Sequence, residues 1–135
     1  MTVATSQKTV LVVEDDPWTR TITTALLAGE GFAVVEAKNG EEGLHLAAEH
    51  KPDVVLLDLA LPTKSGLEVL RELKGSRQTS DIPVIVVSAY GTLMNEADAH
   101  QAAGVIQKPF DYDDLVSQVE QATAGSRDRP LALLG

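Results

Sequence analysis

Residues 9–17 read TVLVVEDDP, and this stretch holds the unit from which the fold is built. Its first five residues are apolar or β-branched, which is typical of a strand covered on both faces. Asp16 and Pro17 have the N-cap and first-turn types that begin a helix. The stretch therefore predicts a buried strand that passes through an acidic turn into a helix.

The same alternation continues along the chain, because four more short apolar runs are each followed by a segment with helical spacing. We expect strands at residues 9–13, 32–37, 54–57, 82–87 and 105–107. Asn39 with Glu42, and Ser65 with Glu68, have the spacing of capping boxes at helix starts. Five successive β-α units predict an α/β fold with a doubly wound parallel sheet, since parallel strands need crossover connections.

The helical segments repeat apolar residues at three- and four-residue intervals, the spacing of one helix face. In the first of these segments Ile22, Ala25 and Leu26 share such a face. We expect Trp18, one turn earlier, to be half-buried beside the acidic turn.

The composition is that of one folded domain, with 135 residues, 44% of them apolar. The net charge of −9 repels phosphate backbones and anionic membranes, so neither nucleic acid nor membrane is an expected partner. The absence of cysteine excludes disulfides, thiolate metal sites and thiol nucleophiles. We expect a cytoplasmic protein with a flexible N-terminus at residues 1–8, one domain at 9–124 and a disordered tail at 125–135.

Polar side chains lie at the carboxyl ends of four predicted strands. They are Glu14 and Asp15 after the first strand, Asp58 after the third, Ser88 after the fourth and Lys108 after the fifth. In an open α/β sheet, ligands bind outside the carboxyl ends of the strands. We therefore expect these five side chains to converge on one crevice.

Acidic side chains that converge need a cation. Two carboxylates about 5 Å apart repel each other by roughly 3 kcal/mol at an effective dielectric constant near 20. Oxygen ligands without His or Cys favour Mg²⁺. With a cation present, Asp58 stays ionised and can attack a phosphorus centre to form an aspartyl phosphate. Lys108 and Ser88 would then stabilise the phosphoryl oxygens by charge and by a hydrogen bond.

Four motifs, in this order, resemble the receiver domain of bacterial response regulators in two-component signalling. They are LVVEDDP at residues 11–17, DVVLLDLALP at 53–62, VVSA at 86–89 and KPF at 108–110. The resemblance implies a flavodoxin-like (βα)5 fold with strand order 2-1-3-4-5, here of the stand-alone type. It also implies that Mg²⁺ is bound by Glu14, Asp15, Asp58 and the backbone carbonyl of Ala60.

The same resemblance implies a phosphorylation-switched protein rather than a turnover enzyme. Asp58 would accept a phosphoryl group from a histidine kinase or a histidine phosphotransfer protein, in a reaction that the domain itself catalyses along with its reversal. Ser88 and Lys108 would contact the phosphoryl group, and the signal would pass to a downstream protein through protein contacts.

Two alternatives remain open. Val105 stands where the family usually has an aromatic residue, and the segment between Ser88 and Lys108 is short, which favours a pseudo-receiver, a binding module with impaired switching. Tyr90 is a candidate substitute for the missing ring. A Mg²⁺-dependent phosphatase is less favoured, because that class needs a second acid two residues after the nucleophile, where this chain has Ala60.

Overall fold

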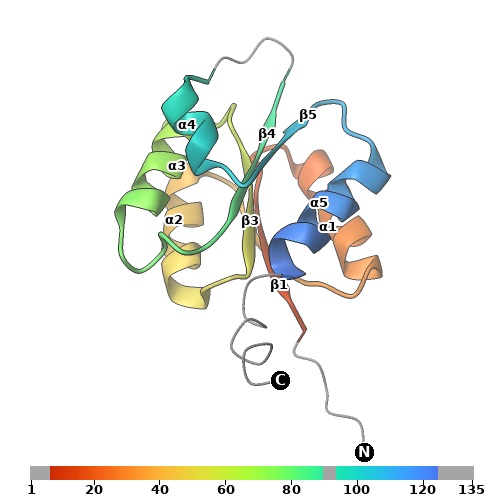
Figure 1. Ribbon diagram of the computed structural model, residues 1–135. Helices are drawn as coiled ribbons and strands as arrows, with labels where there is room; N and C mark the ends of the chain where they lie inside the picture. Colours follow the sequence, from red (N-terminus) through yellow and green to blue (C-terminus); the bar gives the residue numbers. More distant parts are fainter. Residues whose placement is uncertain (1–6, 90–93, 125–135) are drawn as a thin grey trace, which may run out of the picture.

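A central sheet with helices on both sides forms the molecule, which is described by a computed structural model over residues 7–89 and 94–124 (Figure 1). The strands are β1 (Thr9–Val13), β2 (Ala33–Ala37), β3 (Val54–Asp58), β4 (Val84–Ser88) and β5 (Gly104–Gln107). The helices are α1 (Pro17–Gly29), α2 (Gly40–His50), α3 (Gly66–Gly75), α4 (Glu96–Gln101) and α5 (Tyr112–Ala124). The predictions for residues 1–6, for Tyr90 and for the tail at 125–135 lie outside the described residues.

The sheet is parallel, and its strand order β2-β1-β3-β4-β5 confirms the predicted fold class. Asp58 and Ser88 are the last residues of β3 and β4, whereas the sequence predicted strands that stop just before them. The reason is the pairing between neighbouring strands. Asp58 is paired with Val87 across the β3–β4 ladder, and Ser88 with Gln107 across the β4–β5 ladder.

Two apolar layers cover the two faces of the sheet, because successive strand residues point to opposite sides. Leu11 and Val13 belong to the layer under α2 and α3. Val10 and Val12 belong to the layer under α1 and α5. Figure 1 shows α2, α3 and α4 on one side of the sheet and α1 and α5 on the other. The core therefore holds the strands rigidly and leaves their carboxyl ends free to carry polar residues.

Capping interactions begin the helices where the sequence predicted. The Asp16 carboxylate accepts a hydrogen bond from the Thr19 N–H at 2.8 Å, and Pro17 is the first residue of α1. Ser65 and Glu68 form a complete capping box at α3. These caps fix the points at which the chain turns from the strand ends into the helices.

The second predicted capping box is only half formed. Asn39 caps α2 by accepting from the Glu42 N–H at 2.8 Å. The Glu42 carboxylate, however, accepts from the N–H of Lys38 rather than from that of Asn39. The helix α2 begins at the predicted place, but the Glu42 carboxylate bonds to the N–H of the residue before the N-cap.

The outward face of α1 differs from the prediction. Trp18 is 73% exposed and Ile22 is 39% exposed, while Thr23 and Leu27 are the buried residues of this helix. The expectation of a half-buried Trp18 is wrong, because the helix turns the Thr23–Leu27 side toward the sheet. A cluster of apolar side chains is therefore left at the surface beside the strand ends.

No helix in the described ranges is both long enough and apolar enough to cross a membrane.

Candidate functional site

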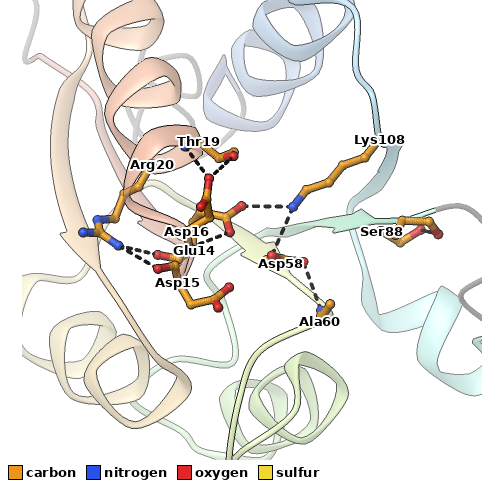
Figure 2. A network of polar contacts seen from close by, with 10 residues as sticks. Glu14, Asp15, Asp16, Thr19, Arg20, Asp58, Ala60, Ser88 and Lys108 are labelled. Atoms are coloured by element: carbon orange, nitrogen blue, oxygen red, sulfur yellow. Dashed lines mark hydrogen bonds and ion pairs between the residues drawn. The ribbon is translucent and has the colours of Figure 1, made fainter.

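The carboxyl ends of β1, β3 and β5 bring three charged side chains together (Figure 2). Glu14 follows β1 directly, Asp58 ends β3, and Lys108 follows β5. Glu14 and Asp58 are 5% and 4% exposed, so both carboxylates are held away from bulk water. Glu14, Asp58 and Lys108 therefore converge at the carboxyl ends of the strands, although Glu14 and Lys108 lie 94 positions apart.

Lys108 bridges the two buried acids. Its Nζ lies 3.1 Å from Glu14 Oε1 and 3.1 Å from Asp58 Oδ2. Burial alone would lower the pKa of Lys108, but the charges and hydrogen bonds of Asp58 and Glu14 outweigh it and raise that pKa. Lys108 is therefore a permanent cation between two anions, and its ammonium partly offsets their mutual repulsion.

Glu14 stays under electrostatic strain despite this pairing. Burial raises its pKa, and the negative charge of Asp58 raises it further. The hydrogen bonds from the Asp16 N–H and the Lys108 ammonium act in the opposite direction without cancelling the rise. The site thus holds more negative charge than its own lysine neutralises.

The backbone around β3 fixes the direction of the Asp58 carboxylate. Asp58 Oδ1 accepts a hydrogen bond from the Ala60 N–H at 3.0 Å. Gly66 packs so closely that a Cβ there would lie 2.4 Å from both the Asp58 carbonyl oxygen and the Leu59 Cα. Only glycine at position 66 allows α3 to approach the end of β3 this closely. Ser65 caps the helix and Gly66 packs against Asp58, so these two residues set the helix start and the position of Asp58.

The three acids form a set of oxygen donors suited to a hard divalent cation. Glu14, Asp15 and Asp58 each offer a carboxylate oxygen within 4.8 Å of the other two. The Asp15 carboxylate is exposed and has no hydrogen-bond partner among the described residues. Carboxylate oxygens without nitrogen or sulfur donors match the preference of Mg²⁺. The residues present therefore fit the predicted cation.

Ser88 is the predicted residue that does not join this group. Its hydroxyl lies 3.5 Å from the carbonyl oxygen of Ala89, at the limit of a hydrogen bond. Figure 2 shows Ser88 to the side of the Lys108–Asp58 pair, without a drawn contact to it. The strand β4 brings Ser88 to the same end of the sheet as the acids, but its side chain stays outside the charge network.

Asp16 has the structural role that the sequence assigned to it. Its carboxylate accepts from both the N–H and the hydroxyl of Thr19, and these hydrogen bonds lower its pKa. It belongs to the helix cap and not to the set of three clustered acids.

Arg20 is a residue of this region that the sequence analysis missed. Its guanidinium donates to the main-chain oxygen of Glu14 at 2.8 Å (Figure 2). One signal was available, because helical side chains lean toward the helix N-terminus and an arginine in the first turns can reach back over it.

A groove of about 490 Å³ opens beside the charged cluster. Its lining combines side chains of α1 with the chain just after β5, namely Trp18, Thr19, Ile22, Thr23, Lys108, Pro109 and Phe110. A volume of this size is within the range of sites that hold a ligand or part of a partner. Lys108 therefore faces the acids and also borders an apolar surface.

Known proteins are similar to this chain in sequence and in architecture. The family model described as the response regulator receiver domain matches residues 10–120. Protein PilH of Pseudomonas aeruginosa is 36% identical over 121 residues, which cover 86% of this chain and 98% of PilH. The polar-differentiation response regulator DivK of Brucella anthropi is 34% identical over 115 residues, covering 84% of this chain and 94% of DivK.

A solved structure gives the same result. The response regulator receiver domain protein of Clostridium thermocellum superposes with a TM-score of 0.81 at 30% identity. The superposition covers 92% of this chain and 98% of that one.

Proposed function

Because the chain belongs to the response regulator receiver domain family, we propose that it is switched by phosphorylation of Asp58. The phosphoryl group comes from a histidine kinase or a histidine phosphotransfer protein, and Mg²⁺ is required. The resulting change is read by a downstream protein. One observation supports this most strongly: the buried Asp58 carboxylate lies 3.1 Å from Lys108 Nζ and clusters with Glu14 and Asp15.

The reaction is a phosphoryl transfer between two nucleophiles. An oxygen of the Asp58 carboxylate attacks the donor phosphorus, and the bond from phosphorus to the donor's imidazole nitrogen breaks. The nitrogen keeps the electron pair of that bond, and the product is a mixed anhydride of Asp58 and phosphate. Glu14, Asp15, Asp58 and the Ala60 carbonyl would hold Mg²⁺, which would supply positive charge to the phosphoryl oxygens.

The protein's own groups prepare this attack. The Ala60 N–H holds Asp58 Oδ1, and the Lys108 ammonium donates a hydrogen bond to Asp58 Oδ2. Lys108 can then pair with a phosphoryl oxygen in place of the carboxylate, because its flexible stem moves at little cost. Ser88 ends the neighbouring strand, and its hydroxyl is available as a further hydrogen-bond donor.

The groove beside the site supports a protein as the donor. Exposed apolar side chains that gather next to a reactive group are typical of an interaction surface. Trp18 and Ile22 supply such a surface on α1, within reach of the groove that Lys108 borders. The net charge of −9 argues against direct nucleic-acid binding and against contact with anionic membranes, in keeping with a cytoplasmic protein.

Mass spectrometry of the intact chain tests the assignment of Asp58. With acetyl phosphate and Mg²⁺, we expect one phosphoryl group per chain that is stable to acid and labile to base. Asp58→Asn should incorporate none, and omission of Mg²⁺ should prevent incorporation in the parent. Asp81→Asn, at an exposed acid outside the site, is the matched control and should behave as the parent. Equal incorporation by Asp58→Asn would show that the nucleophile is another residue.

A pseudo-receiver is the second candidate, and two observations favour it. The Ser88 hydroxyl lies outside the charge network, and Val105, which replaces the family's usual aromatic residue, is 49% exposed. Hydrogen exchange distinguishes the two functions. A switching receiver changes its protection in β4 and β5 on phosphorylation, whereas a pseudo-receiver takes up no phosphoryl group or takes it up with unchanged exchange.

A further inference from the structure

We propose that Arg20 is a positioning residue for the metal-binding acids. It acts by clamping the main chain that carries Glu14 and Asp15, and it contacts neither carboxylate. This role rests on the proposed function, because it assigns to Arg20 the geometry of the cation site described there.

The guanidinium of Arg20 links α1 to the turn after β1 and to β2. Its NH1 lies 2.8 Å from the main-chain oxygen of Glu14 and 3.5 Å from that of Asp15. Its Nε lies 3.4 Å from the carboxylate of Glu36 in β2, which orients the planar group from the opposite side. The Arg20 side chain is only 18% exposed, so the clamp is held in place by its surroundings. Figure 2 shows the guanidinium beside this turn, at the left of the view, with dashed lines to the main chain of Glu14 and Asp15.

The two acids depend on this clamp to different degrees. Glu14 is fixed on several sides, because its N–H donates to the Ala37 carbonyl and its carboxylate is bonded to Lys108 and to the Asp16 N–H. The Asp15 carboxylate has no hydrogen bond within the described part of the chain. The direction of Asp15 is therefore set mainly by its backbone. Arg20 NH1 donates to the carbonyl of Glu14, in the peptide unit just before Asp15, and lies at the limit of a hydrogen bond from the carbonyl of Asp15 itself.

A role through position and a role through charge predict opposite results. Arg20 is a cation close to a cation site, so by charge alone its removal should tighten Mg²⁺ binding. If the clamp holds Asp15 and Glu14 in the geometry that a small octahedral ion demands, removal should weaken binding instead. The sign of the change in Mg²⁺ affinity separates the two.

Isothermal titration calorimetry with MgCl₂ at fixed ionic strength provides the measurement. We expect Arg20→Met to weaken Mg²⁺ binding about tenfold, the lower end of the range for residues that orient metal ligands. Arg20→Lys conserves the charge but cannot make the same set of contacts, and we expect a loss of about threefold. Hydrogen exchange at residues 14–16 should be faster in both variants.

Arg71→Met is the matched control. Arg71 also pairs with a carboxylate, that of Asp98 in α4, and it lies outside the acidic site. Its removal should lower the melting temperature without changing the Mg²⁺ affinity or the exchange at residues 14–16. A general loss of stability is thereby separated from a loss of metal-site geometry.

The possible failures are distinguishable. If the parent binds Mg²⁺ and Arg20→Met binds it equally well or more tightly, the positioning role is overturned while the proposed function stands. If the parent binds no Mg²⁺, the metal assignment fails and the positioning role fails with it. If Arg20→Met does not fold, Arg20→Lys decides, and an affinity equal to that of the parent overturns the role.

Discussion

The strand ends on the two sides of the site are held very differently. At β1 and β3, Glu14 and Asp58 are buried, and each of their carboxylates has partners on both oxygens. At β4 and β5, the Ser88 hydroxyl has, among the described residues, one contact at the limit of a hydrogen bond, and Val105 is half exposed. Lys108 follows β5 but bonds to the acids of β1 and β3, so it links the two sides. The side at β1 and β3, which we call the acceptor side, is therefore held in place without a ligand. The side at β4 and β5 has fewer contacts that would oppose a change.

The close packing of Gly66 is the most direct way to break the acceptor side. Gly66→Ala places a methyl group against backbone atoms that cannot move aside, and we expect a loss of at least about 3 kcal/mol in the free energy of unfolding. Gly75→Ala, in the same helix but with open space around it, should be neutral or slightly stabilising. Urea unfolding of both variants makes the measurement. Equal stabilities would mean that α3 does not approach β3 as described.

Loss of the link between the two sides should have the next largest effect. Lys108→Met leaves Glu14 and Asp58 buried without their cation, and we expect a loss of about 2 kcal/mol in the free energy of unfolding. Mg²⁺ should restore part of that stability in the variant, because it supplies the missing positive charge. Thermal unfolding with and without Mg²⁺ tests this. A variant as stable as the parent without Mg²⁺ would show that Lys108 does not offset the repulsion.

Removal of one acid should stabilise the metal-free protein. Burial and the charge of Asp58 raise the pKa of Glu14 above its ordinary value of 4.5. Between the two values the folded state binds more protons than the unfolded state, so this group's contribution to stability falls as the pH rises. We expect Glu14→Gln to be more stable than the parent by about 1 kcal/mol at pH 7 and equal to it below pH 4.

Two measurements on Glu14→Gln make that prediction specific. The free energies of unfolding of Glu14→Gln and the parent should converge as the pH falls toward 4. Calorimetry should show that the variant has lost Mg²⁺ binding. A variant less stable than the parent at pH 7 would mean that the Lys108 bond to Glu14 outweighs the repulsion from Asp58.

The β5 side should show the smallest effect. Val105→Ala removes a half-exposed side chain, and we expect a change within about 0.5 kcal/mol. Its partner across the ladder, Val86, is fully buried, and Val86→Ala should cost about 2 kcal/mol. Chemical unfolding of the pair compares the packing of β5 with that of its neighbour β4. A large loss for Val105→Ala would show that β5 is packed as tightly as its neighbours.

Much of the fold could be predicted from the sequence, and the errors have physical causes. The bounds of β1 were predicted correctly. The strands β3 and β4 each end one residue later than predicted, and β4 also begins two residues later, because pairing with a neighbouring strand decides where a strand begins and ends. The outward position of Trp18 was missed, since the sequence placed Ile22, Ala25 and Leu26 on the apolar face of α1, whereas Thr23 and Leu27 are the residues that the helix buries. Only packing against the sheet decides between these two faces.

The candidate site divides in the same way. The acids at the strand ends and the lysine before Pro109 could be found from their places in the alternating pattern, since the carboxyl ends of parallel strands share one edge. That Ser88 lies apart from them could not be found, because it depends on the direction of a side chain in space, which has no signature in residue spacing. Arg20 offered one signal, its place in the first turns of α1, but its contacts with the main chain of Glu14 and Asp15 depend on how the helix packs.

The amino-acid order alone determined the alternating strands and helices, the caps and the presence of acids at the strand ends. These are local properties, set by the period of apolar residues and by the hydrogen bonds that neighbouring residues can make. Tertiary structure alone decided that Lys108 Nζ lies 3.1 Å from a carboxylate oxygen of Glu14 and of Asp58. It also decided that Arg20 donates to the main chain of the turn between β1 and α1. Such contacts depend on how the sheet and its two helical layers pack together, because packing brings distant parts of the chain within bonding distance.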